Sequence, residues 1–183
     1  FGKDGKRYGG LAIKADGLDL KYSRDQIQER GFLTRSHSTI GRKFAKDSLN
    51  LNYKVNDNLK LQYLYTNQVA EYDSLNKKSP ERSTFNQSTY DFHVLNLNYQ
   101  NNDFFFNTYG RRHDMKGKTW SLKDHVRKPG GTNNVIENFG AEMRNKWDIG
   151  NSKLTAGVIF DREEADYSSI KKNRNNTALY ALG

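Results

Sequence analysis

The chain has 183 residues, of which 34% are hydrophobic, and it carries a formal net charge of +9. It contains no cysteine, which excludes disulfide frameworks, cysteine zinc sites and thiol catalysis, and it has no run near the roughly 18 apolar residues of a spanning helix. The excess of Lys and Arg favours anionic partners such as lipid phosphate, nucleic acid or an acidic small ligand.

Two predicted hairpins open the chain. The first turns over Asp-Gly at 16–17, and the second alternates leucine or tyrosine with asparagine or lysine through 49–55. Asn-Asp-Asn at 56–58 favours a tight reversal, and the alternation resumes through 59–66. Because successive side chains of a strand point to opposite faces, each strand has an apolar face and a polar face.

Two further hairpins are predicted, with turns at 101–103 and 149–152. One irregularity precedes the third turn: Phe92 and Val94 lie at even positions, whereas Leu95 and Leu97 lie at odd ones. Either a β-bulge near Val94 restores the register, or the upper half of this strand stands clear of lipid.

Long polar connections are predicted near 25–40, 74–89, 114–134 and 168–183, so that short turns alternate with long loops. This asymmetry is typical of an outer-membrane barrel with periplasmic turns and extracellular loops. The sequence therefore predicts an all-β fold, an antiparallel up-and-down transmembrane β-barrel segment of about eight strands. Residues 1–183 would form a partial outer-membrane β-barrel, part of a larger barrel.

The alternative for this pattern is a soluble β-sandwich, a binding module for glycan or nucleic acid. Strands of about ten residues, a polar face suited to a wet lumen, and aromatic residues close to the turns favour the barrel. These aromatic residues are Tyr53, Tyr99 and Trp147. A passive porin-like barrel would show the same strands and stays open.

Residues 17–39 and 48–65 resemble the early barrel of TonB-dependent outer-membrane receptors. The matching residues are Tyr22-Ser23, which ends a strand, and the Gly-Phe element at 31–36. In that element Leu33 stands where the family usually has arginine, and Arg35 where it has asparagine. The opening residues 1–13 resemble the segment that follows the plug domain of such receptors.

The resemblance implies a location in the bacterial outer membrane and import of a scarce ligand such as an iron-siderophore, heme or cobalamin. The receptor barrels have about 22 strands, and the plug that contacts the TonB complex has no counterpart here. The implied partners are a small anionic or metal-chelate ligand, outer-membrane lipid and lipopolysaccharide, and the TonB complex through the plug. The chain starts at Phe1 rather than methionine, and we expect it to be a piece of a longer protein.

No catalytic residues, metal site or cofactor are predicted, and the four histidines are scattered without metal-binding spacing. We therefore expect a protein that is not an enzyme. The basic segment 110–131 combines cations with an aromatic ring, as suits an anionic, partly planar ligand. Nucleic acid is not expected as its partner, and a simple solvated loop is the alternative. The candidate ligand-binding residues are Arg35, Arg111, Arg112, Trp120, Lys123, His125 and Arg127.

Overall fold

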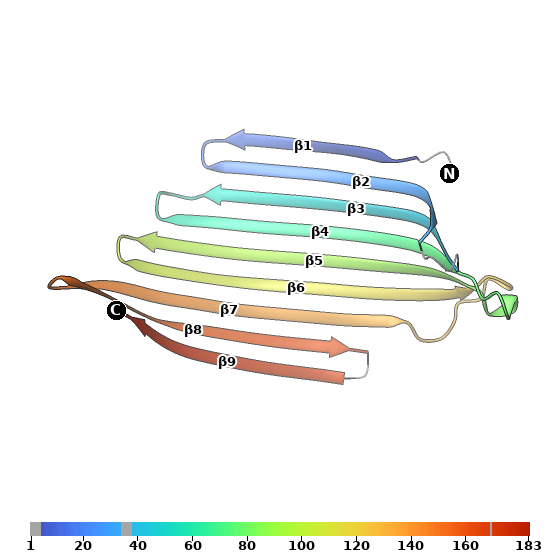
Figure 1. Cartoon of the computed structure of the whole chain (residues 1–183). Coiled ribbons are helices and arrows are strands. Elements are labelled where there is room, and N and C mark those ends of the chain that lie inside the picture. Colours follow the sequence, from blue (N-terminus) through green and yellow to red (C-terminus); the bar gives the residue numbers. More distant parts are fainter. Residues whose placement is uncertain (1–4, 34–37, 169) are drawn as a thin grey trace.

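The structure is a computed structural model that describes residues 5–33, 38–168 and 170–183. Nine strands form one antiparallel sheet in chain order (Figure 1). They are β1 (Arg7–Ala15), β2 (Leu18–Phe32), β3 (Thr39–Lys54), β4 (Leu59–Ser74), β5 (Thr84–Asn101), β6 (Phe104–Ser121), β7 (Thr132–Ile149), β8 (Ser152–Tyr167) and β9 (Ile170–Leu182). The short helical turn η1 (Pro80–Arg82) precedes β5. Among the described residues, no helix is long and apolar enough to cross a membrane.

Nine strands agree with the expected count of about eight. The loop expected at 168–183 is wrong, because β9 occupies 170–182. Residues 170–182 pair with β8, from Tyr167 opposite Ile170 to Thr155 opposite Leu182. No strand was predicted here, because the run from Lys171 to Asn176 is polar on both faces and shows no alternation. Because Tyr167 pairs with Ile170, β9 returns directly from β8 at the end of the sheet where long connections were expected.

The other long connections are shorter than the sequence indicated. Strand β2 continues to Phe32, and residues 34–37 of the first expected loop lie outside the described residues. The next two connections span 75–83 and 122–131, because β5 and β6 extend into segments that are polar on both faces. The four short turns lie at the opposite end of the sheet, on the left in Figure 1. Their positions step progressively along that edge from β1–β2 to β7–β8. Such a stagger is what tilted strands of a barrel wall show.

Cross-strand pairing sorts the side chains into two faces, since directly opposite residues lie on the same side of a sheet. We call one the leucine face and the other the asparagine face. The leucine face carries Leu20, Leu51, Leu61, Leu97, Phe106, Met143 and Val158. The asparagine face carries Asn50, Asn52, Gln62, Asn96, Asn98, Asn107 and Asn138.

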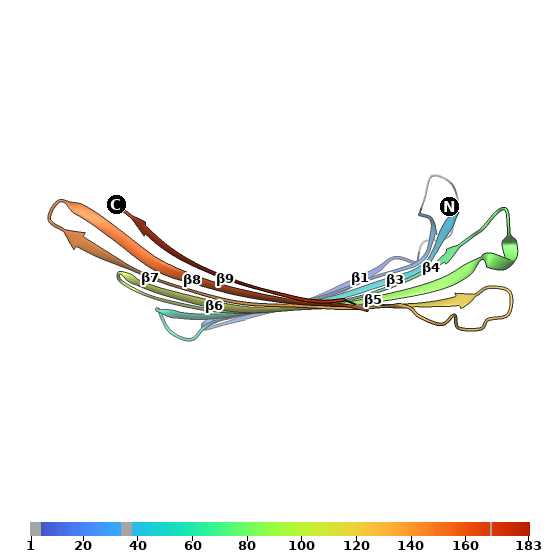
Figure 2. The ribbon, with the colours of Figure 1, turned by 90° about the horizontal axis from the view of Figure 1, so that it is seen from below.

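The sheet is one curved layer (Figure 2). Large apolar side chains of the leucine face are therefore open to the surroundings: Leu95 is 50% exposed and Leu179 is 82% exposed. The sandwich alternative is wrong for the residues that the structure describes, because all nine strands belong to a single sheet. Some other medium or partner must cover the leucine face.

Of the two explanations considered for the phase change at Val94, the β-bulge is wrong. Strand β5 pairs residue for residue, without a register shift, with β4 over 84–99 and with β6 over 84–101. The apolar residues instead change faces: Leu95 and Leu97 lie on the leucine face, whereas Tyr90 and Phe92 lie on the asparagine face. The half of the leucine face next to the short turns is thus apolar, and we call it the apolar belt. Beyond it, the same face becomes polar and charged, beginning with His93 and Asp91 on β5.

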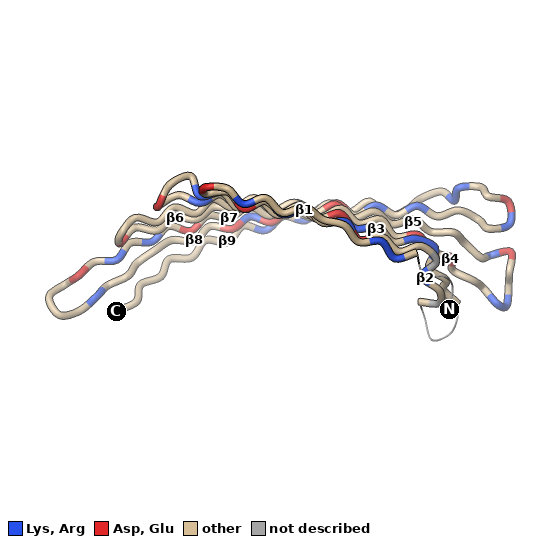
Figure 3. The backbone as a smooth tube through the Cα atoms, turned by 90° about the horizontal axis from the view of Figure 1, so that it is seen from above, with Lys and Arg blue, Asp and Glu red and all other residues tan. Residues whose placement is uncertain are grey.

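Several amides of the asparagine face form a hydrogen-bonded ladder across β3, β4 and β5. Asn52 donates to Asn50 at 3.0 Å, Gln62 donates to Asn52 at 3.1 Å, and Asn96 donates to Gln62 at 3.1 Å. Charged residues of both signs run along the strands and into the connections (Figure 3). A face of this composition is suited to contact with water or with another polar surface.

Tyr109 of β6 lies directly opposite Gly140 of β7 on the asparagine face. Their contact can be used to test the register of these two strands. A Cβ at Gly140 would lie 2.4 Å from the Tyr109 ring, whose hydroxyl donates to Asp161 at 2.9 Å. We expect Gly140→Val to displace the ring, break this hydrogen bond and lower the free energy of unfolding by about 1–3 kcal/mol.

The measurement is urea unfolding of the full-length protein in lipid vesicles. Gly110→Val is the matched control, because a Cβ at Gly110 would meet nothing within 4 Å. Equal losses in the two variants would show that the Tyr109 contact has no energetic role.

Candidate ligand-binding site

The candidate ligand-binding residues do not form one cluster. Trp120 is near the end of β6, and Lys123, His125 and Arg127 follow it in the connection 122–131. Arg111 and Arg112 lie in the middle of β6, and Arg35 is outside the described residues. At about 3.3 Å per residue, Arg112 is about 26 Å from Trp120 along the strand.

The connection 122–131 is an ordered extension of β6. Trp120 forms an isolated antiparallel bridge with Arg127, and Ser121 N–H donates to the Val126 carbonyl at 2.9 Å. Asp124 accepts the Val126 N–H at 3.1 Å. Hydrogen bonds from the Ser121 side chain and from the Val126 amide lower the pKa of Asp124. Its negative charge therefore persists among the exposed cations of this loop at neutral pH.

The ring of Trp120 is less available for stacking on a ligand than the composition of the basic segment 110–131 indicated. Its ring packs against Phe85 of the adjacent strand, with ring centroids 5.2 Å apart. Both rings lie on the leucine face. Lys123 and Arg127 are exposed, so the cationic part of the predicted site is open to an anion. The tryptophan ring, in contrast, is in contact with Phe85.

Arg111 and Arg112 point to opposite faces, because they are consecutive in a strand. Arg111 lies on the asparagine face, with its guanidinium 4.9 Å from the centre of the Tyr109 ring. Arg112 lies on the leucine face and pairs with Asp114 at 3.1 Å and with Glu137 at 2.8 Å. Of the two, only Arg111 shares a face with the amide ladder.

Sequence reasoning missed a second cluster on the asparagine face. His113 and Met115 of β6 lie opposite Phe92 and Tyr90 of β5, and we call these four residues the His–Met site. The His113 ring centroid is 6.0 Å from Phe92 and 6.3 Å from Tyr90. Within the described ranges, no side chain hydrogen-bonds the ring nitrogens of His113. The change of apolar phase at 90–94 was the signal for this cluster.

The part of the chain that the structure describes has no group of three or more His, Asp or Glu side chains able to hold a metal ion. The His–Met site supplies two donor atoms of another kind, an imidazole nitrogen and a thioether sulfur. Both are soft or intermediate ligands, suited to copper rather than to magnesium or calcium.

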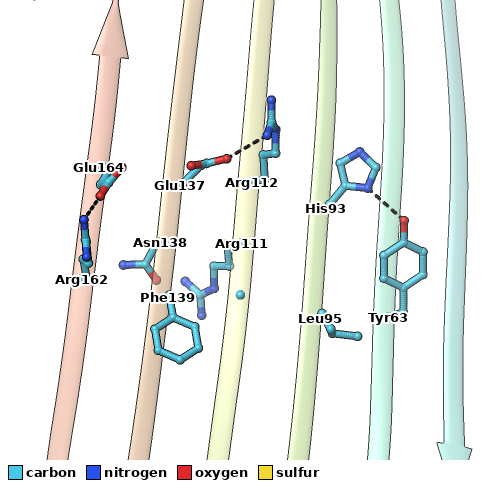
Figure 4. Close-up of a pocket in the computed structure, with 11 residues that line it drawn as sticks. Tyr63, His93, Leu95, Arg111, Arg112, Glu137, Asn138, Phe139, Arg162 and Glu164 are labelled. Carbon is cyan, nitrogen blue, oxygen red and sulfur yellow. Dashed lines mark hydrogen bonds and ion pairs between the residues drawn. The ribbon is translucent and has the colours of Figure 1, made fainter. Parts of the chain in front are cut away.

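A depression of about 410 Å³ lies on the opposite face of the same strands (Figure 4). We call this depression the amphipathic notch. Gly110 lines it between Leu95 and Phe139. On its polar side Arg112 pairs with Glu137, and Arg162 pairs with Glu164. Tyr63 and His93 close it through a hydrogen bond of 2.9 Å between the hydroxyl and Nδ1.

No protein-family model matches the sequence, and no curated protein matches it. Solved structures match the fold. The chain is similar to the copper transporter OprC, with a TM-score of 0.57 and 15% identity over 95% of this chain and 32% of that one. It is also similar to the outer membrane transporter YddB from Escherichia coli, with a TM-score of 0.54 and 11% identity over 96% of this chain and 31% of that one.

The chain thus spans about a third of the length of the structures that it matches. The comparisons confirm the predicted fold class: an all-β, antiparallel segment of a larger barrel of the kind found in outer-membrane transporters. This fold agrees with the resemblance drawn from Tyr22-Ser23 and the element at 31–36.

Proposed function

We propose that this chain is a wall segment of a bacterial outer-membrane importer that takes up a scarce small ligand with energy delivered by the TonB complex. The observation that carries the proposal is the apolar belt, which crosses the sheet on the leucine face while the asparagine face at the same height is polar. In the fold of an outer-membrane transporter, the leucine face would meet lipid and the asparagine face would line the lumen.

Strand length supports this arrangement. The strands β5, β6 and β7 have 18 residues each, whereas a tilted strand crosses a bilayer with about 9–11. The remaining residues would extend beyond the membrane on the side of the long connections. There the leucine face would meet water, which accounts for its change to charged residues at Asp91, Arg112 and Glu137.

The described residues of this segment would bind and guide a ligand and perform no bond chemistry. The exposed cations Lys123 and Arg127 would attract an anionic chelate at the outer opening, and Arg111 would meet it further down the lumen. These features support the ligands expected from the sequence, an iron-siderophore, heme or cobalamin, as cargo. The TonB complex would act through a plug domain in the lumen.

A second cargo is favoured by the His–Met site. One of the matched structures is described as a copper transporter, and His113 and Met115 present adjacent donors on the face assigned to the lumen. Copper(I) prefers thioether and imidazole ligands. We propose that these two side chains contribute ligands to a copper ion in transit, with the remaining ligands supplied from elsewhere in the lumen.

Uptake by cells that express the full-length protein tests the function. Import of copper or of ferric siderophores should require both the protein and an intact TonB complex. Uptake that continues unchanged without TonB, together with solute flux through the protein in liposomes, would instead establish a passive porin.

A further inference from the structure

The leucine face beyond the apolar belt carries two kinds of cation. In the first kind, which includes two arginines that line the amphipathic notch, the charge is matched by a carboxylate of the same face. These ion pairs are Arg24 with Asp47, Arg112 with Asp114 and Glu137, Arg162 with Glu164, and Lys171 with Asp166. In the second kind, Lys116 and Lys118 near the outer end of β6 are exposed and have no ion-pair or hydrogen-bond partner among the described residues.

The residues directly opposite these two lysines are uncharged. They are Thr89 and Asn133 for Lys116, and Gln87 for Lys118. The carboxylates next to this group already have partners: Asp114 is paired with Arg112 at 3.1 Å, and Glu71 accepts a hydrogen bond from Gln87 at 3.1 Å. An anion that approaches Lys116 and Lys118 therefore meets no carboxylate directly opposite them.

A third cation lies beside the two lysines. Arg127 forms an antiparallel bridge with Trp120, which places it on the leucine face too, because directly opposite residues lie on the same side of a sheet. It is exposed and has no ion-pair partner in the part of the chain that the structure describes. This position is compatible with the attraction of cargo, since charges act over about 8–10 Å in physiological salt. We call Lys116, Lys118 and Arg127 the cationic strip.

The cationic strip lies too far beyond the apolar belt for a phospholipid headgroup to reach it. The leucine face becomes charged at Arg112, and Lys116 and Lys118 follow four and six residues later on β6. At about 3.3 Å per residue and a strand tilt of about 40°, they are about 10 and 15 Å above the level of Arg112. The headgroup layer of a phospholipid bilayer extends only about 5–8 Å beyond the hydrocarbon on each side. Membrane anions that reach the strip must therefore be carried further outward, as phosphates on a sugar chain are.

We propose that the cationic strip binds phosphate groups on the sugar core of lipopolysaccharide in the outer leaflet. The lysine ammonium groups donate hydrogen bonds to phosphate oxygens, and Arg127 presents the guanidinium fork that matches a phosphate. Phe85 and Trp120, with ring centroids 5.2 Å apart on the same face, offer an apolar surface to the sugar rings. This inference rests on the proposed function, because it requires that the leucine face meets the outer membrane.

The test uses the full-length protein in detergent, native mass spectrometry and a buffer without divalent cations, which would bridge phosphates to carboxylates. Two lipopolysaccharides with the same lipid A are compared, one with phosphates on its core sugars and one without them. The phosphorylated form should be retained at least about fivefold better, the factor expected for each cation beside an anionic membrane surface. The double substitution Lys116→Gln and Lys118→Gln should lower retention of the phosphorylated form at least about fivefold and leave retention of the other form unchanged.

The double substitution Lys46→Gln and Lys172→Gln is the matched control. It removes the same charge from two exposed lysines in the outer half of the asparagine face, opposite Gln68 and Ala165. These lysines would face the lumen rather than the membrane. Retention of the phosphorylated lipopolysaccharide by this variant should equal that of the wild type.

Equal retention of the two lipopolysaccharides by the wild type would overturn the proposal, as would unchanged retention in the Lys116→Gln and Lys118→Gln variant or an equal loss in the control. Cargo uptake separates this result from the proposed function, because Lys116 and Lys118 face away from the lumen and their substitution should leave uptake unchanged. Normal TonB-dependent uptake without the lipopolysaccharide preference would refute the lipid site alone. The preference together with uptake that does not need TonB would refute the importer alone.

Discussion

Replacement of Leu97 by arginine should lower the free energy of unfolding in lipid vesicles by about 2–4 kcal/mol. Leu97 lies in the apolar belt, between Leu61 on β4 and Thr108 on β6. A guanidinium at this position would have to leave water for hydrocarbon, since the polar end of the leucine face begins several residues away. The measurement is urea unfolding and refolding of the full-length protein.

Asn107→Arg is the control for this variant. Asn107 lies at nearly the same height as Leu97 but on the asparagine face, directly opposite Glu142. An arginine there would meet a wet lumen and a carboxylate, so its cost should be within about 0.5 kcal/mol of zero. A larger loss for Asn107→Arg than for Leu97→Arg would mean that the two faces have been assigned the wrong way round.

Removal of the His–Met donors should have the largest effect on transport. His113→Ala and Met115→Leu should each weaken copper(I) binding at least about tenfold, because loss of an outer-shell partner alone costs a metal site about 10–100-fold. Met115→Leu retains the apolar volume and removes the thioether sulfur. Binding is measured by competition with a copper(I) chelator, with silver(I) as a redox-stable probe, and uptake is followed in parallel.

His93→Ala provides the matched control. His93 is on the neighbouring strand β5 but on the leucine face, where its Nδ1 is hydrogen-bonded to Tyr63. The His93→Ala substitution should have no effect on copper(I) binding if the cargo passes along the asparagine face. Wild-type binding in both His113→Ala and Met115→Leu would refute the metal cargo, and normal siderophore uptake in these variants would leave the importer proposal standing.

The strands and their faces could be predicted where the period-two pattern is strong. The turns at 16–17 and 102–103 need backbone dihedrals that Gly17 and Asn102 adopt, with φ of 71° and 44°, and their residue types indicated this. Strand β9 could not be found in this way, because its first half is polar on both faces. Only pairing with β8 defines it.

The candidate site was harder to predict than the fold. Arg111 and Arg112 were grouped with the basic loop, although a strand directs consecutive side chains to opposite faces. The missing information was where β6 ends, which the charged residues between Asp114 and Lys118 obscured. The apolar phase change at Val94 was visible in the sequence, but a bulge explained it equally well. The uninterrupted pairing of β5 decides between these interpretations.

The proposed function requires that the apolar belt meets lipid and that the same face leaves the membrane near His93. The chain has no cysteine, so single spin labels at Asp91, Asn96 and Leu97 of the full-length protein in lipid vesicles measure it directly. We expect position 97 to be accessible to oxygen dissolved in the bilayer, and positions 91 and 96 to be accessible to a water-soluble paramagnetic reagent. A water-accessible position 97, or a lipid-exposed position 96, would contradict it.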